Sequence, residues 1–139
     1  MAEVFDIIET EAGKFIDDRF VLNTRAEPER TAKWTENMTR IIDPAEVIAI
    51  YDDTFFRGGG DGFLLTANRL ACSNPSETPF VIHYEKIQAV GVKQGNWIRP
   101  EKVTITHENE VSEIQIQSHD SKVEFAQAVA ATLRRLAAK

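Results

Sequence analysis

Strict alternation of apolar and polar residues in two short segments constrains this chain more than any other feature. In residues 103–106 (Val-Thr-Ile-Thr) and 114–117 (Ile-Gln-Ile-Gln), every second side chain is apolar. Successive side chains of a strand point to opposite faces, so each segment has one face on a core and one in water. With a reversal at 108–110 between them, these segments predict an antiparallel sheet that covers a hydrophobic core.

Five more strands are predicted upstream of this pair. Asp43 precedes Pro44, and a residue before proline is disfavoured from helical geometry, so we set a boundary there. The strand-like runs after it are residues 47–53, 62–66, 69–73, 80–83 and 87–92. Four glycines between 58 and 62 join the first two runs, and glycine permits the positive φ that a tight reversal requires. The sequence therefore predicts seven antiparallel strands, arranged as a barrel or a sandwich.

Helical periodicity marks both ends of the chain. Residues 3–18 and 27–40 are predicted to form two amphipathic helices, and the segment 20–25 is either a short strand or a connector. A closing helix is predicted from Ser121 to Ala137, with Ser121 and Glu124 at the spacing of a capping box. We accordingly expect a helical segment at residues 1–42 and a β-domain with a C-terminal helix at residues 43–139.

Composition disfavours several classes of function. The 139 residues carry a formal net charge of −6, which disfavours a nucleic-acid binder that neutralises phosphates. Cys72 is the only cysteine, so neither an intrachain disulfide nor a cysteine zinc site is expected. Residues 1–6 lack the pattern of a signal peptide, and no apolar run reaches the ~20 residues of a membrane-spanning helix. We expect a cytoplasmic protein without a transmembrane segment.

Particular residues carry a resemblance to a known family. Asp52-Asp53-Thr54-Phe55, the glycine-rich turn, Gly62-Phe63-Leu64-Leu65-Thr66 and Tyr84-Glu85-Lys86-Ile87 resemble the pattern of bacterial PH-like (pleckstrin-homology superfold) domains of unassigned function. The resemblance covers residues 43–137. It implies an α+β, mainly β fold of seven antiparallel strands capped by a C-terminal helix, here preceded by two helices. It also implies a binding scaffold for peptides, proteins or lipid headgroups rather than an enzyme.

The first strand–strand loop departs from the PH domains that bind phosphoinositides, which carry a set of basic residues there. Between residues 52 and 63 the single basic residue is Arg57, against Asp52, Asp53 and Asp61. A multiply charged phosphate would meet like charge at this loop. Phosphoinositide binding is therefore not expected.

The sequence contains only weak candidates for a catalytic or a metal-binding site. His83, His107 and His119 lack the spacing of a zinc protease, and we expect them at the surface. Cys72 and His83 on adjacent strands form a conceivable dyad, but no orienting carboxylate or oxyanion hole is recognisable. We expect no cofactor, no metal and no catalysis, with an enzyme that uses Cys72 and His83 as the least favoured alternative.

Two groups of residues are candidate binding surfaces. The first is Trp97 with Lys93, Arg99 and Lys102, in which Trp97 is either a core residue or an exposed anchor for a protein or an anionic partner. The second is the helical stripe of Trp34 and Met38, which either packs on the domain or docks another protein.

We therefore predict a non-catalytic module for protein–protein interaction or self-association, with the N-terminal helices as an interaction element. The alternative is a peripheral lipid- or small-ligand-binding module.

Overall fold

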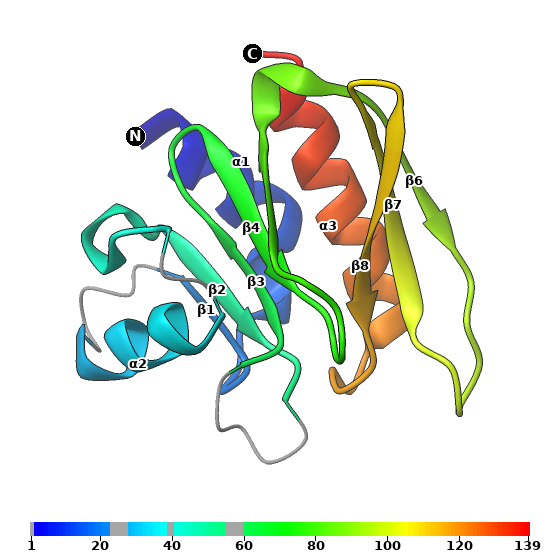
Figure 1. Ribbon diagram of the computed structural model, residues 1–139, viewed down its shortest axis with the longest axis horizontal. Helices are drawn as coiled ribbons and strands as arrows, with labels where there is room; N and C mark the ends of the chain where they lie inside the picture. The colour runs from blue at the N-terminus through cyan, green and yellow to red at the C-terminus, as the bar shows by residue number, and fades with distance from the viewer. Residues whose placement is uncertain (1, 23–27, 39–40, 55–59) are drawn as a thin grey trace.

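The computed structural model describes residues 2–22, 28–38, 41–54 and 60–139 (Figure 1). Its helices are α1 (Ala2–Ala12), α2 (Pro28–Met38) and α3 (Lys122–Ala137), with one-turn 3-10 helices at Gly13–Phe15, Pro44–Glu46 and Tyr84–Lys86. Its strands are β1 (Phe20–Leu22), β2 (Ala49–Asp52), β3 (Gly62–Leu65), β4 (Arg69–Ser73), β5 (Phe80–His83), β6 (Ile87–Lys93), β7 (Glu101–His107) and β8 (Glu110–Ile116). The fold is α+β and mainly β, as predicted, and the described part of the N-terminal segment holds a 3-10 turn, Gly13–Phe15, in addition to the two α-helices.

The strands form two antiparallel sheets rather than a closed barrel. One sheet has five strands in the order β1-β2-β3-β4-β5, and the other has three in the order β6-β7-β8. β1 lies beside β2, with Phe20 opposite Tyr51, so the described strands number one more than the seven predicted. A three-residue strand is too short to show alternation, and this is why residues 20–25 were ambiguous.

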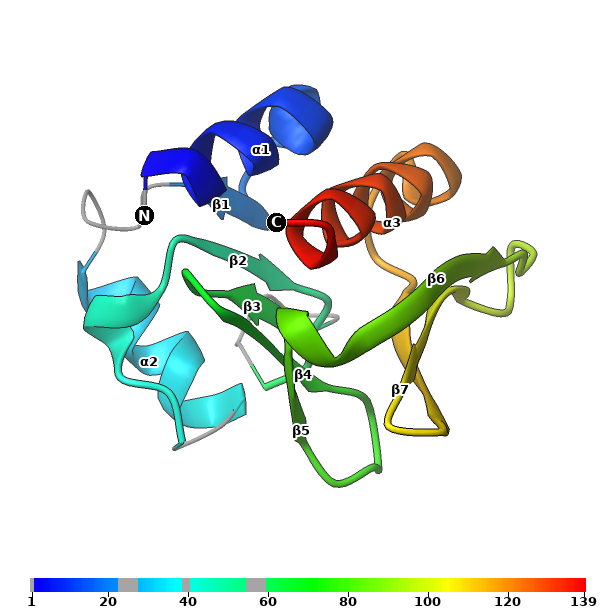
Figure 2. The ribbon, with the colours of Figure 1, turned by 90° about the horizontal axis from the view of Figure 1, so that it is seen from above.

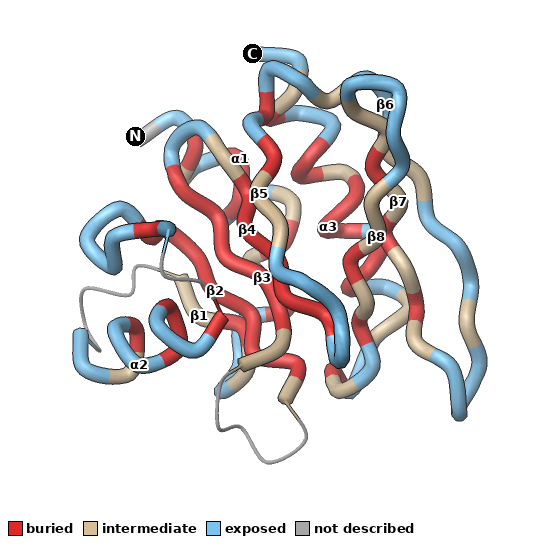
Figure 3. Tube along the Cα trace, in the orientation of Figure 1, coloured by how far each residue is buried: buried red, intermediate tan, exposed pale blue. Residues whose placement is uncertain are grey.

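Both faces of the five-stranded sheet are covered, and its central strands β2, β3 and β4 are buried except at Arg69, the first residue of β4 (Figure 3). Tyr51, Phe63 and Leu70 point into the main core, whereas Ile50 and Leu64 point to the other face. The sequences of such strands are nearly continuous apolar runs without alternation, because neither face of the sheet is in water.

The main core lies between the two sheets and a pair of neighbouring helices, α1 and α3 (Figure 2). Val4 and Ile8 of α1 share this core with Phe125 and Leu133 of α3. At the rim, the Arg135 guanidinium lies 3.1 Å from a Glu11 carboxylate oxygen and ties α3 to α1. The part of segment 1–42 that holds α1 and β1 therefore belongs to the same core as the β-domain.

The start of α3 differs from the predicted capping box. The Ser121 side chain makes no capping hydrogen bond, and its backbone N–H donates instead to His119 Nδ1 at 3.0 Å. Since Nδ1 accepts this N–H, Nε2 is the ring nitrogen left to donate, and it faces the Phe15 carbonyl oxygen at 3.2 Å. His119 is buried against Phe125, so its predicted surface position was wrong.

The side chain of Asn74 joins the two sheets at a place where no backbone ladder connects them. Asn74, just after β4, donates to the Glu113 carbonyl at 2.7 Å and accepts the Gln115 N–H at 3.0 Å. An amide side chain that both donates and accepts in this way substitutes for a strand neighbour.

Within the described residues, no helix is long and apolar enough to cross a membrane.

Candidate functional site

The connection between β6 and β7, residues 94–100, is the candidate site, because it presents apolar side chains on a well-ordered turn. The Asn96 N–H donates to the Arg99 carbonyl at 3.1 Å, which closes a four-residue turn with Trp97 and Ile98 in its centre. The Asn96 Oδ1 accepts the N–H groups of Ile98 at 2.8 Å and of Arg99 at 2.9 Å. Asparagine side chains commonly form such turns with their own backbone, so this local geometry is encoded in the sequence.

A glycine and a buried carboxylate hold the base of this β6–β7 loop. The Gly95 N–H donates to Glu101 Oε2 at 2.6 Å, and Glu101 is 1% exposed. A Cβ atom at Gly95 would lie 2.2 Å from the Pro100 carbonyl oxygen, so only glycine allows the two arms of the loop to approach so closely.

Helix α3 braces the loop from the side. The Lys122 ammonium, in the first turn of α3, donates to the carbonyl oxygens of Asn96 and, at 3.1 Å, of Arg99. These contacts link the loop to a helix that is anchored in the main core. The loop is consequently positioned before any partner arrives.

The loop displays its two large apolar side chains to solvent. Trp97 is 85% exposed and Ile98 is 66% exposed. Of the two alternatives for Trp97, the structure shows the exposed one. A tryptophan left in water forgoes about 1.5–3 kcal/mol of burial free energy, so this position is unfavourable for the isolated molecule.

Positive charge surrounds this apolar tip. Lys93 and Lys102 lie directly opposite each other on β6 and β7, and Arg99 is exposed on the turn itself. Like charges directly across a sheet are unfavourable, and the Lys102 ammonium is partly offset by a Glu113 carboxylate oxygen at 3.6 Å. The structure thus brings the four predicted residues of this site into one small region.

The second predicted binding surface is buried. Trp34 and Met38 are 3% and 2% exposed, packed with Ile50, Leu64 and Ala71 against the outer face of the five-stranded sheet. These two residues are therefore not available as a docking surface in this structure. The apolar outer face of the sheet explains why α2 packs there.

The proposed nucleophile pair does not form. Cys72 is opposite Phe80 and points into the main core, whereas His83 is opposite Arg69 at the other end of β5 and is exposed. Cys72 and Arg69 are three residues apart, so their side chains point to opposite faces of the sheet. Burial raises the pKa of the Cys72 thiol well above its usual range, which disfavours the reactive thiolate.

The carboxylates before the glycine-rich turn have structural roles, while Arg57 and residues 55–59 lie outside the described residues. Asp53 Oδ1 accepts the Tyr51 hydroxyl at 2.6 Å and the N–H groups of Gln117 and Ser118 at 2.9 and 2.8 Å. Burial raises the pKa of Asp53 despite these donors. Asp53 thus joins β2 to the end of β8 and connects the two sheets, whereas Asp52 accepts the N–H of the nearby Thr54 at 2.9 Å.

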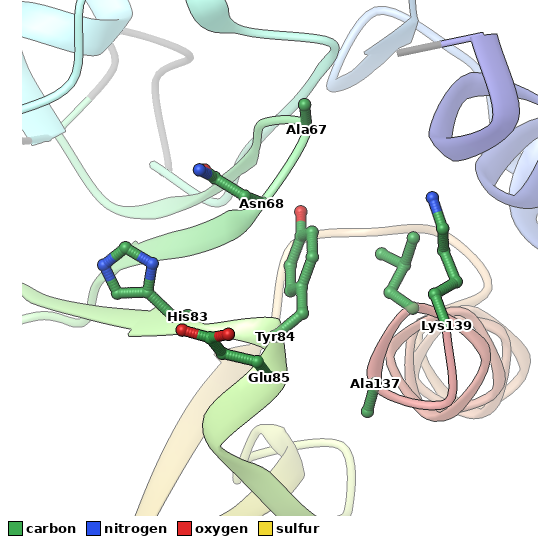
Figure 4. Close-up of a pocket in the computed structure, with 8 residues that line it drawn as sticks. Ala67, Asn68, His83, Tyr84, Glu85, Ala137 and Lys139 are labelled. Atoms are coloured by element: carbon green, nitrogen blue, oxygen red, sulfur yellow. The ribbon is translucent and has the colours of Figure 1, made fainter.

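Two shallow pockets flank the 3-10 turn after β5, and neither contains a recognisable site. The first, about 250 Å³ in volume, is shown in Figure 4; it is lined by Ala67, Asn68, His83, Tyr84, Glu85, Leu136, Ala137 and Lys139. The Tyr84 hydroxyl donates to the Thr66 carbonyl at 2.7 Å, and Lys139 lies 3.4 Å from Glu3. The second, about 320 Å³, lies on the other side of His83 near His107. No group of three or more metal-ligating side chains is found within the described residues.

Sequence reasoning missed two residues of the candidate site. Ile98 is the second exposed apolar side chain of the tip. It could have been predicted from the sequence, because it directly follows Trp97 with no polar residue between them. Lys122 was missed because its role depends on the start of α3 lying beside a loop more than twenty residues earlier. No one-dimensional pattern encodes that proximity.

Comparison with protein-family models finds no match for this chain, and comparison with curated proteins finds none either.

Proposed function

We propose that this chain is a non-catalytic binding module that attaches to a macromolecular surface through its β6–β7 loop. The observation that carries this proposal is the exposure of Trp97 and Ile98 on a turn whose geometry is fixed by hydrogen bonds. Tryptophan and arginine are the residues most enriched at binding hot spots. A loop ordered in advance binds without a large entropic penalty, which favours association.

We also propose that the fold is PH-like. The strands β2 to β8 followed by α3 correspond to the seven strands and closing helix of that superfold, and α1, β1 and α2 are additions. PH-like folds mostly bind peptides, proteins or lipid headgroups, so this assignment supports a binding role. The cytoplasm is the predicted location, in keeping with a single buried cysteine.

Two kinds of surface suit such a loop. A protein partner, or a second copy of this chain, would have to supply a pocket for Trp97. A membrane would accept the apolar tip at its interface, and the exposed cations beside the tip favour this second candidate.

Site-specific photo-crosslinking tests the binding role. A photoreactive amino acid at Ile98 is expected to yield covalent adducts in cells of the organism that encodes the chain. The same group at Val111, which is 65% exposed at the far end of the same sheet, serves as the matched control. Adducts of protein or lipid that form at position 98 and not at 111 support the proposal. Equal yields at both positions, or none at 98, would refute it.

A further inference from the structure

We infer that the β6–β7 loop docks on an anionic phospholipid bilayer, with Trp97 and Ile98 in the interfacial region and the exposed Lys93 and Arg99 facing the headgroups. This inference rests on the proposed binding function and names the surface that the loop recognises. Three observations favour a membrane over a protein surface: the size of the apolar tip, the hydrogen bonding of its backbone and the distribution of charge.

The apolar contact area is a small tip. Among the described residues, the exposed large apolar side chains near this turn are Trp97, Ile98 and, at 38% exposure, Val92 on β6. A stable protein interface buries about 800 Å² on each partner and surrounds its anchor with further contacts. Two adjacent apolar residues at the tip of a hairpin suit shallow insertion at a bilayer interface, where tryptophan is enriched.

Part of the loop backbone is paired internally, which suits a region with little water. The N–H groups of Ile98 and Arg99 donate to Asn96 Oδ1, and the Arg99 carbonyl accepts from the Asn96 N–H and from Lys122. Unpaired backbone groups are strongly unfavourable in a membrane, so their internal pairing lowers the free energy of insertion.

The charge distribution complements an anionic surface. From Lys93 to Lys102 the one acidic residue is Glu101, which is buried under Gly95, while Lys93 and Arg99 are exposed. The whole chain has a net charge of −6, so an anionic surface would repel the rest of the molecule and attract this loop. The field would therefore orient the loop towards the bilayer.

Vesicle co-sedimentation of the full chain tests this inference. We expect binding to vesicles of phosphatidylcholine with about one third phosphatidylserine, and at least tenfold weaker binding to pure phosphatidylcholine or at high salt. Trp97→Ala should weaken binding about tenfold or more, and Lys93→Gln and Arg99→Gln about fivefold each. The matched controls, Val111→Ala for an exposed apolar residue and Lys33→Gln for an exposed cation on α2, should bind like the unmodified chain.

Tryptophan fluorescence gives an independent measurement of insertion. Brominated lipids should quench the emission of Trp97, whereas the Trp97→Phe variant, which retains only the buried Trp34, should not be quenched. Absence of binding to the anionic vesicles, or equal binding of Trp97→Ala, overturns the inference. Adducts at Ile98 that contain protein and no lipid overturn it too, but leave the proposed binding function intact.

Discussion

The two tryptophans of this chain occupy opposite environments, although each has an arginine close by in sequence. Trp34 in α2 is 3% exposed, with the Arg30 guanidinium 4.1 Å from its ring centre, whereas Trp97 in the β6–β7 loop is 85% exposed. The apolar stripe of α2 packs against an apolar face of the five-stranded sheet, so both surfaces are removed from water. The loop offers Trp97 no such partner. An aromatic residue on a periodic stripe therefore indicates packing, and one at the centre of a polar turn indicates contact with something outside the chain.

The largest expected effect comes from removing residues 1–42, which include Trp34. Such a deletion also removes α1 and β1, and with them Val4, Ile8 and Phe20 of the main core. We expect residues 43–139 alone not to fold, since several buried apolar side chains are lost at once. Circular dichroism during heating measures this. A cooperative melting transition of the truncated chain would show instead that the N-terminal part is a separable interaction element, as the sequence analysis predicted.

Single substitutions test the comparison of the two tryptophans directly. Trp34→Ala should lower the free energy of unfolding by about 3–5 kcal/mol, because it leaves a cavity between α2 and the five-stranded sheet. Trp97→Ala should change it by no more than about 0.5 kcal/mol, because the side chain is mostly in water. Urea denaturation of both variants measures the difference. Similar losses in the two variants would contradict the roles assigned here.

Much of the fold was predictable from sequence because apolar periodicity reports burial. The bounds of β4 and β5 match the predicted 69–73 and 80–83, and α1 and α2 form in the two N-terminal regions predicted to be helical, although α1 ends at Ala12 and not at residue 18. Features that depend on distant contacts were not predictable. β1 needs β2 as its partner, and the interaction of Asp53 with Gln117 spans more than sixty residues. His119 is buried because Phe15 and Phe125 surround it, and no local pattern encodes that.

The candidate site was predictable in composition but not in geometry. Lys93, Trp97, Arg99 and Lys102 are close in sequence, so their proximity in space follows from a short loop between paired strands. Whether Trp97 folds back or projects depends on the Asn96 turn and on the support from Lys122. The contact from Lys122 requires the start of α3 to lie beside the loop. Sequence periodicity predicts where this helix falls along the chain, but not which loop it lies against in space.

An intermediate effect is expected at the base of the loop. Gly95→Ala brings a Cβ to within 2.2 Å of the Pro100 carbonyl oxygen, so the backbone must move. We expect a loss of about 1–3 kcal/mol in the free energy of unfolding and weaker binding through Trp97. Gly91→Ala is the matched control, because its Cβ would meet the Thr104 hydroxyl at 3.1 Å, and that side chain can rotate. Equal stability of the two variants would show that the loop does not depend on this close approach.

A small effect on stability is also expected at Lys122, whose ammonium holds the loop to α3. Lys122→Met keeps the aliphatic stem but removes the hydrogen bonds to the carbonyls of Asn96 and Arg99. Because these contacts are near the surface, we expect a loss of only about 0.5–1.5 kcal/mol in stability.

The larger consequence of Lys122→Met is dynamic. A loop without this support reorients more freely, so the fluorescence anisotropy of Trp97 should fall. Trp34 is buried in α2, which Lys122 does not contact, so any change in anisotropy reports on the loop. Lys86→Met, at an exposed lysine in the 3-10 turn after β5, is the control for loss of a surface charge. Unchanged anisotropy in Lys122→Met would mean that the Asn96 turn alone orders the tip, and that α3 contributes nothing to presenting Trp97.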